Sequence, residues 1–117
     1  MLKVLIAEDD HTMVTLLQTL FKMEGFDVVV ADEDADIPAL ILRENPDVLF
    51  MDVHLGKHSG LKIVKSIRKN LKLANLRIVM TSGLSMKEDC IQQGANDFIL
   101  KPFMPDELMK ILRNHNT

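Results

Sequence analysis

The sequence predicts a single α/β domain, with an open parallel sheet of five strands and helices on both faces of the sheet. Its 117 residues are the length of one domain, and 47% of them are hydrophobic, which is enough for one sizeable core. Its short apolar runs are continuous rather than alternating, as in strands buried on both faces of a parallel sheet. Strand-like and helix-like segments alternate five times without a low-complexity linker or an internal repeat, so residues 1–117 form one domain.

Five apolar runs are the predicted strands. They are residues 2–7, 26–31, 48–51, 77–81 and 98–100. Between the first two, apolar side chains recur at the three- and four-residue spacing of an amphipathic helix, and Gly25 marks its end. The apolar positions of this helix are Met13, Leu16, Leu17, Leu20 and Phe21.

Four further helices follow the later strands. The second helix begins at a capping residue, Asp36. In the third, an apolar stripe faces the core and basic side chains cover the other faces. The stripe consists of Leu61, Val64, Ile67 and Leu71. The fourth helix ends at Gly94, and the fifth begins near Pro105.

Polar side chains follow four of the five predicted strands, at the edge of an open α/β sheet where ligands bind. They are Glu8, Asp9 and Asp10 after the first strand, Asp52 after the third, Thr81 at the end of the fourth and Lys101 after the fifth. Neighbouring carboxylates repel one another unless a cation binds between them, and Mg²⁺ prefers such oxygen ligands. A hydroxyl, an ammonium and Mg²⁺ around one aspartate suit phosphoryl transfer, in which the aspartate itself can be the nucleophile.

Five short motifs occur in a specific order along the chain. They are Leu5-Ile6-Ala7-Glu8-Asp9-Asp10, Pro46-Asp47-Val48-Leu49-Phe50-Met51-Asp52, Val79-Met80-Thr81-Ser82-Gly83, Gly94-Ala95-Asn96-Asp97-Phe98 and Lys101-Pro102-Phe103. By these motifs the chain, from residue 1 to about residue 113, resembles the receiver domain of two-component response regulators. The resemblance implies a flavodoxin-like (βα)5 fold with the strand order 2-1-3-4-5.

The resemblance also implies roles for the acidic residues. Asp52 matches the phosphoacceptor. Glu8 and Asp9 match the acidic pair, in which Asp9 would bind Mg²⁺ (or Mn²⁺) directly and Glu8 would bind it through water. The alternative pair, Asp9 and Asp10, stays open here, although Asp10 also suits the start of the first helix. The backbone carbonyl of His54 matches the remaining metal ligand.

A conformational switch is the second implication of the resemblance. Thr81 matches the hydroxyl that moves to meet the phosphoryl group, and Lys101 matches its ammonium partner. Phe98 matches an aromatic side chain whose rotamer follows the switch. The Lys101-Pro102 bond resembles the family's cis peptide bond, a conformation that proteins adopt almost only before proline.

Three departures from the family pattern concern loops around this site. Gly56 follows Leu55 where the family usually has proline, which predicts a more mobile loop and an altered rate of dephosphorylation. Gly83, two residues after Thr81, leaves open a side where a larger side chain often gates the attacking water. Residues 32–36 lack the usual Asn-Gly or Asp-Gly turn before the second helix.

The function implied by the resemblance is signalling rather than enzymatic. The domain would take a phosphoryl group onto Asp52 from a histidine kinase or a histidine phosphotransfer protein, with Mg²⁺ bound. The surface of the fourth helix, fifth strand and fifth helix would then switch to control a partner or output, and the same surface suits a homodimer.

Two alternatives to this function are a small aspartyl-phosphate phosphatase or phosphotransferase and a non-phosphorylated docking receiver. The phosphatase or phosphotransferase is disfavoured because such enzymes commonly have another aspartate where this chain has His54. The docking receiver is disfavoured because the site residues are intact.

Composition and charge exclude several other classes of protein. No apolar run approaches the roughly 20 residues that span a bilayer, and the acids at 8–10 come too early for a signal peptide, so no membrane contact is expected. The single cysteine, Cys90, fits a reducing cytoplasm. A net charge of −3 and a pI near 5.7 disfavour direct nucleic-acid binding.

The near-neutral total hides a divided chain. Residues 1–56 hold twelve acidic and three basic side chains, whereas residues 57–117 hold five and eleven. The basic segment follows the polar side of the third helix and predicts a solvent-facing surface. Its members are Lys57, Lys62, Lys65, Arg68, Lys69 and Lys72. The histidines His11, His54 and His58 have no accompanying cysteine, which disfavours a zinc site.

Overall fold

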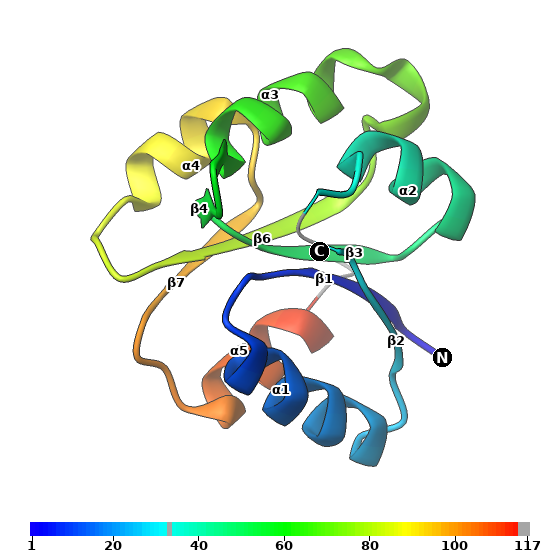
Figure 1. The fold of residues 1–117 in the computed structure, drawn as a ribbon, viewed down its shortest axis with the longest axis vertical. Helices are drawn as coiled ribbons and strands as arrows, with labels where there is room; N and C mark the ends of the chain where they lie inside the picture. Colours follow the sequence, from blue (N-terminus) through cyan, green and yellow to red (C-terminus); the bar gives the residue numbers. More distant parts are fainter. Residues whose placement is uncertain (33, 115–117) are drawn as a thin grey trace.

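A five-stranded parallel sheet forms the centre of the computed structural model, which describes residues 1–32 and 34–114. The strand order is β2-β1-β3-β6-β7, or 2-1-3-4-5 when only the strands of this sheet are counted (Figure 1). The predicted α/β, flavodoxin-like fold and its strand order are therefore confirmed. The strands are β1 (Lys3–Ala7), β2 (Asp27–Val30), β3 (Val48–Asp52), β6 (Arg77–Ser82) and β7 (Asp97–Leu100).

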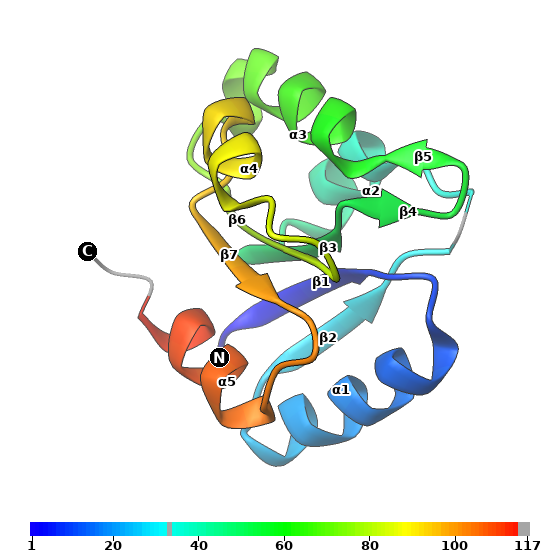
Figure 2. The same cartoon turned by 90° about the vertical axis from the view of Figure 1, so that its left-hand side faces the viewer.

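Helices cover both faces of this sheet: α1 and α5 lie on one face, and α2, α3 and α4 on the other (Figures 1 and 2). Successive residues of a strand point to opposite faces, so Leu5 joins the apolar cluster on the α2–α4 side while Val4 and Ile6 join the one beside α1 and α5. No helix among the described residues is both long and apolar enough to cross a membrane. The helices are α1 (His11–Met23), α2 (Ile37–Glu44), α3 (Gly60–Lys69), α4 (Lys87–Gln93) and α5 (Pro105–Arg113).

The strand register brings the predicted site positions together. Asp52, the last residue of β3, pairs with Thr81 of β6, and Thr81 pairs with Ile99 of β7. Ala7, the last residue of β1, pairs with the residue before Asp52. The loop that carries residues 8–10 therefore leaves the sheet beside the end of β3.

A small antiparallel hairpin follows β3, where the sequence predicted only a loop. It consists of β4 (His54–Leu55) and β5 (His58–Ser59), which pair across a two-residue turn. Gly56 is the first turn residue, and its φ of 58° lies in the left-handed region that favours glycine. Ser59 then caps α3 by accepting a hydrogen bond from the backbone amide of Lys62. The hairpin is thus tied directly to the start of a helix.

The region after α3 corrects two predictions. Leu71 was predicted to face inward but is 90% exposed, because α3 ends at Lys69 and a 3-10 turn (Leu71–Leu73) buries Leu73 instead. Arg68 was predicted to face solvent, yet its guanidinium is partly buried and donates five hydrogen bonds. The acceptors are the backbone carbonyls of Gly94, Leu73, Ala74 and Leu76 and the side chain of Asn96.

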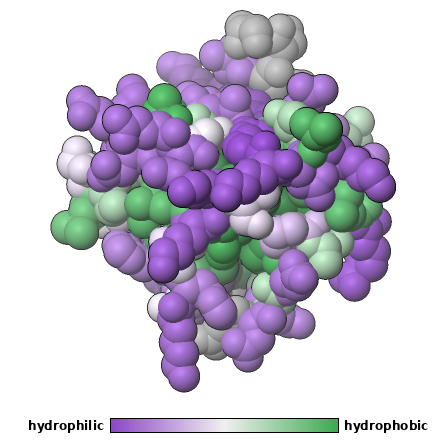
Figure 3. All heavy atoms as spheres, turned by 90° about the horizontal axis from the view of Figure 1, so that it is seen from above, coloured by the Kyte–Doolittle hydropathy of each residue, from purple (hydrophilic) through white to green (hydrophobic). Residues whose placement is uncertain are grey.

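The lysines of the basic segment are exposed, as predicted. Viewed from above, the surface over the α2–α4 layer carries a broad hydrophilic band (Figure 3). Apart from Arg68, the basic side chains of residues 57–72 are all exposed to solvent. This face therefore has the character of a solvated helix surface.

A second partly buried arginine, Arg77, joins the start of β6 to the end of α5. Its guanidinium donates to the backbone carbonyl of Leu112 at 3.1 Å and to that of Ile111, and it forms an ion pair with Asp97 at 3.0 Å. Positive charge is favourable at the carboxyl end of a helix, where the last carbonyls have no partner within the helix. The end of α5 is consequently fixed to β6 and β7.

Candidate functional site

The centre of the site is the carboxylate of Asp52, at the carboxyl end of β3. The residue is only 6% exposed. Its Oδ2 accepts a hydrogen bond from Lys101 Nζ at 2.6 Å, and its Oδ1 accepts one from the backbone amide of His54 at 2.8 Å. Both carboxylate oxygens therefore have a donor, which is what a buried negative charge requires.

Lys101 links two carboxylates, because Nζ also donates to Glu8 Oε2 at 3.0 Å. The peptide bond from Lys101 to Pro102 is cis, and it lies just after β7. Burial lowers the pKa of Lys101, but the hydrogen bonds to Asp52 and Glu8 outweigh burial and raise the pKa overall. The ammonium group therefore remains charged at neutral pH.

Glu8 is the most perturbed acid of the site. Burial raises the pKa of Glu8 to about 7, the hydrogen bond from Lys101 opposes this rise, and the neighbouring Asp52 adds to it. Its Oε1 accepts a hydrogen bond from the backbone amide of Asp10 at 3.2 Å. Without a cation, this carboxyl group is therefore partly protonated at neutral pH.

Glu8→Gln should change how stability depends on pH. Because the folded pKa of Glu8 lies near 7 and its ordinary value is 4.5, the folded state holds more protons than the unfolded state between these pH values. The free energy of unfolding therefore contains a favourable contribution at pH 4.5, which is lost by pH 7 and amounts to roughly 2–3 kcal/mol.

Urea denaturation at several pH values, with EDTA present, would measure this effect. Because glutamine resembles the protonated glutamate and does not titrate, the unfolding free energy of the wild type should fall relative to that of Glu8→Gln as the pH rises across that window. Parallel pH profiles for the two proteins would contradict the assignment of the raised pKa to Glu8.

Asp9 and Asp10 are neighbours with different contacts. Asp9 Oδ2 accepts a hydrogen bond from the backbone amide of Gly56 at 2.9 Å, whereas Asp10 Oδ1 caps α1 by accepting from two amides of its first turn. One carboxylate oxygen from each of Glu8, Asp9 and Asp52 lies within 4.8 Å of the others. Asp10 is outside this group, so the acidic pair that gathers with Asp52 is Glu8 and Asp9.

Thr81 lies on β6, the strand next to β3, and Phe98 lies on β7, the strand beyond β6. Thr81 is fully buried, and its Oγ1 donates to the backbone carbonyl of Ile99 at 2.8 Å. Phe98 is partly buried and packs against the apolar cluster on the α2–α4 side of the sheet. The hydroxyl beside Asp52 is therefore bonded to β7, the strand that carries Phe98.

Comparison with known families decides the identity of the fold. The family model described as "Response regulator receiver domain" matches residues 4–113, which is nearly the whole chain. The chain belongs to the response regulator receiver domain family. This assignment agrees with the resemblance in the motifs and with the confirmed fold.

Relatives and solved receiver domains agree with this assignment. The transcriptional regulatory protein KdpE of Staphylococcus aureus is 32% identical over 114 residues, which cover 95% of this chain and 48% of KdpE. The chain spans about half the length of the curated relatives it matches. The receiver domain of Francisella response regulator 1452 is 30% identical, with a TM-score of 0.87 and coverage of 97% of this chain and 94% of that chain.

A third similar protein was solved with a metal ion. The receiver domain of the sensor histidine kinase PA1611 from Pseudomonas aeruginosa PAO1 has a magnesium ion coordinated in its active-site cleft. It has a TM-score of 0.85 and 25% identity, with coverage of 97% of this chain and 96% of that chain.

Most predicted site residues of this receiver domain gather at one edge of the sheet. They are Glu8, Asp9, Asp52, Thr81 and Lys101. His54 contributes its backbone amide to Asp52. The amide and carbonyl of one residue in an extended strand point to the same side, so the His54 carbonyl faces this edge as well.

Two glycines of the receiver domain contact the site in ways that sequence reasoning missed. The amide of Gly56 binds Asp9, and the only signal for this contact was a glycine in place of the usual proline. Gly60 lies so close to β3 that an added Cβ would be 2.5 Å from the carbonyl oxygen of Asp52. Its signal was the retained Ser59-Gly60 pair, whose packing role the sequence does not reveal.

The side chains of Cys90 and of three histidines lie outside the group of carboxylates around Asp52. Cys90 is fully buried, and burial, with a smaller effect of the Asp89 charge, raises the pKa of its thiol to about 11. Glu8, Asp9 and Asp52 are called the acidic cluster below. Within residues 1–32 and 34–114, no other group of three or more metal-binding side chains lies close enough together to share an ion. His11, His54 and His58 are not part of the acidic cluster.

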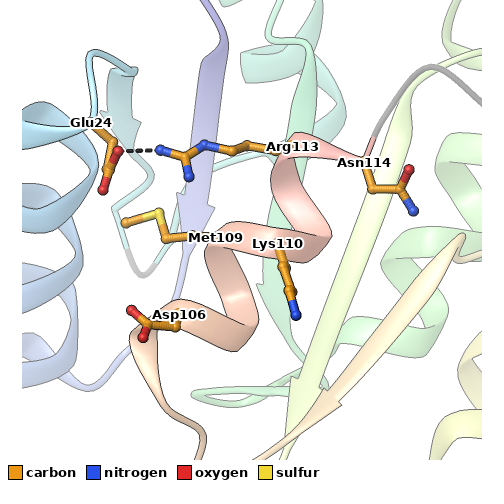
Figure 4. Close-up of a pocket in the computed structure, with 6 residues that line it drawn as sticks. All are labelled: Glu24, Asp106, Met109, Lys110, Arg113 and Asn114. Carbon is orange, nitrogen blue, oxygen red and sulfur yellow. Dashed lines mark hydrogen bonds and ion pairs between the residues drawn. The ribbon is translucent and has the colours of Figure 1, made fainter.

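Two hollows differ in their relation to the acidic cluster. One of about 450 Å³ lies between α1 and α5, where the Glu24–Arg113 ion pair joins the two helices (Figure 4). Its lining residues are Glu24, Asp106, Met109, Lys110, Arg113 and Asn114. Another, of about 150 Å³, is bordered by Glu8 and Asp9 and so adjoins two of the clustered carboxylates.

Proposed function

We propose that this receiver domain accepts a phosphoryl group on Asp52 from a histidine kinase or a histidine phosphotransfer protein, with Mg²⁺ or Mn²⁺ bound. The observation that carries the proposal is the buried Asp52 carboxylate, held by Lys101 at 2.6 Å beside the carboxylates of Glu8 and Asp9. Family membership supports the same role. The acyl phosphate would act as a signal rather than as a step in the turnover of a substrate.

The donor set suits a hard divalent cation. Three carboxylates within 4.8 Å of one another, without nitrogen or sulfur ligands, match the preference of Mg²⁺ and Mn²⁺ for oxygen. Glu8, Asp9, Asp52 and the backbone carbonyl of His54 would hold the ion. When bound, the ion supplies positive charge that stabilises the phosphoryl oxygens during transfer. The magnesium ion in the PA1611 receiver domain supports this choice.

The residues around Asp52 prepare it for nucleophilic attack. A carboxylate oxygen of Asp52 forms a bond to phosphorus while the P–N bond of the donor phosphohistidine breaks. The electron pair of that bond stays on the histidine ring nitrogen, which takes up a proton. Lys101 and the His54 amide hold the carboxylate in one orientation, and the Lys101 ammonium offsets charge on the phosphoryl group.

Thr81 would convert phosphorylation into a change of conformation. Its Oγ1 donates to the Ile99 carbonyl in this structure, and it would donate to a phosphoryl oxygen instead once Asp52 is modified. The Ile99 carbonyl would then lose a partner, and β7 would shift together with Phe98. Phosphorylation in this way favours one of two pre-existing states.

The surface that would respond contains α4, β7 and α5. Several large apolar side chains are exposed on these elements or beside them. They are Leu84, Ile91, Leu100 and Met104. Exposed apolar groups of this kind are typical of protein-binding surfaces, which supports a partner or a second copy of the chain at this place. Homodimer formation through this surface is part of the proposal.

Metal removal tests the proposed chemistry. With acetyl phosphate and Mg²⁺, the chain should acquire one phosphoryl group with the hydroxylamine sensitivity of an acyl phosphate. Chelation with EDTA should slow labelling by roughly 100-fold, because the cation's charge stabilisation is lost. Intact-mass spectrometry over time gives both rates. A chain that remains unlabelled with Mg²⁺ would instead support the docking receiver.

A further inference from the structure

We propose that the backbone amide of Gly56 is a positioning group for the metal site. It would fix the Asp9 carboxylate within the acidic cluster and so raise the affinity for the divalent cation. The observation is the hydrogen bond from the Gly56 amide to Asp9 Oδ2 at 2.9 Å, between residues 47 apart in the chain. This inference rests on the proposed function, since it concerns the same cation.

The hairpin presents two amides to the site, not one. His54 and Gly56 are two residues apart along β4 and the start of its turn, so their amides point to the same side of the strand. The His54 amide donates to Asp52 at 2.8 Å, and the Gly56 amide donates to Asp9. One backbone segment therefore orients two of the three clustered carboxylates.

Glycine at position 56 makes this contact possible. Its φ of 58° is that of the first residue of a type II′ turn, a position that glycine dominates. Proline fixes φ near −65° and has no N–H, so it would supply neither the turn nor the donor. From the sequence, glycine in place of proline was expected to make the loop more mobile. In the structure this glycine instead provides a hydrogen-bond donor for Asp9.

The rest of the hairpin holds this donor in place. Leu55 is buried in the core at 3% exposure. The backbone amide of Gly60 donates to the Val53 carbonyl at 2.6 Å, which closes the base of the hairpin, and Ser59 caps α3. The Gly56 amide is thus attached to a packed strand and a helix, not to a free loop.

The expected benefit is a more ordered metal ligand. Asp9 is exposed, unlike Glu8 and Asp52, so its carboxylate would otherwise be free to turn toward solvent. A hydrogen bond to a carboxylate is among the stronger ones, and outer partners of metal ligands typically change metal affinity by roughly 10–100-fold. The Gly56 amide is the outer partner of Asp9 in this structure.

The test compares three changes at position 56 by Mn²⁺ affinity, read from the EPR signal of free Mn²⁺. Gly56→Pro removes the amide hydrogen and the turn, and should weaken binding by at least roughly 10-fold. D-alanine in place of Gly56 is the matched control, because its mirror-image backbone suits the positive φ of this position and it keeps the amide; its affinity should stay within about threefold of the wild type. Glycolic acid in place of Gly56 makes an ester that removes the N–H alone, and it should also weaken binding by at least roughly 10-fold.

Further measurements separate this inference from its basis. Urea denaturation without metal checks that each variant is folded, and the ester variant decides the question if the proline variant is not. Mg²⁺ titration followed by NMR should shift the amide signals of Asp10 and His54 in the wild type. If neither Mg²⁺ nor Mn²⁺ binds the wild type, the proposed metal site itself is wrong. If the wild type and the ester variant bind Mn²⁺ equally well, the metal site stands and the role of Gly56 is wrong.

Discussion

Asp52→Asn should abolish phosphorylation by acetyl phosphate, with labelling at least roughly 100-fold slower than in the wild type. The amide side chain is similar in size but is a poor nucleophile, and it removes one of the three carboxylates of the cation site. The variant should still fold, because Lys101 keeps its bond to Glu8 and the asparagine oxygen can still accept a hydrogen bond. Intact-mass spectrometry after incubation with acetyl phosphate and Mg²⁺ measures the effect.

The control for this experiment is Asp27→Asn. Asp27 is an exposed aspartate at the start of β2, and it is outside the acidic cluster. Its replacement should leave the rate and the extent of labelling unchanged. Stoichiometric labelling of Asp52→Asn would move the phosphoacceptor to another residue and overturn the proposed function.

Gly60→Ala should lower the free energy of unfolding by about 3 kcal/mol. The added Cβ would lie 2.5 Å from the Asp52 carbonyl oxygen and 2.9 Å from Val53 Cα. Both are backbone atoms, and the Gly60 amide is already bonded to the Val53 carbonyl at 2.6 Å, so the chain has little freedom to relax. The loss is large, because the free energy of unfolding of a natural domain is only about 5–15 kcal/mol in total.

Gly83→Ala is the matched control for overpacking. A Cβ at Gly83 would meet no atom within 4 Å, and its φ is not in the left-handed region. Its unfolding free energy should therefore remain within about 0.5 kcal/mol of the wild type. Urea denaturation followed by far-UV circular dichroism compares the two variants. Equal midpoints for Gly60→Ala and Gly83→Ala would show that α3 can move away from β3.

The fold was predictable because its main signals are local in sequence. Each strand of the sheet begins and ends within two residues of the limits of a predicted apolar run. Asp36 caps α2 as predicted. The gathering of Glu8, Asp52 and Lys101 was predictable as well. The carboxyl ends of neighbouring parallel strands meet at one edge, so residues directly after them become neighbours whatever their separation in the chain.

Contacts made by the backbone were beyond the sequence patterns. The bond between Gly56 and Asp9 depends on a turn conformation and on an amide that every residue except proline has, so no side chain reports it. Periodicity also fails at helix ends, because the spacing that predicted an inward Leu71 continues past the last helical residue. Arg68 was misread for a related reason, because three of its acceptors are backbone carbonyls at helix ends: Gly94 after α4, and Leu73 and Ala74 at the end of the 3-10 turn.

The hydrogen bonds from Arg77 hold α5 at its carboxyl end, so the two ends of this helix differ in how freely they can move. Its carboxyl end is bound through the carbonyls of Ile111 and Leu112, whereas its amino end follows the segment that carries Lys101. Nine helical residues span about 13 Å, so a small tilt about the Arg77 pivot gives its largest displacement at Pro105. Motion that begins at the acidic cluster would thus be greatest at the near end of α5 and smallest at the far end.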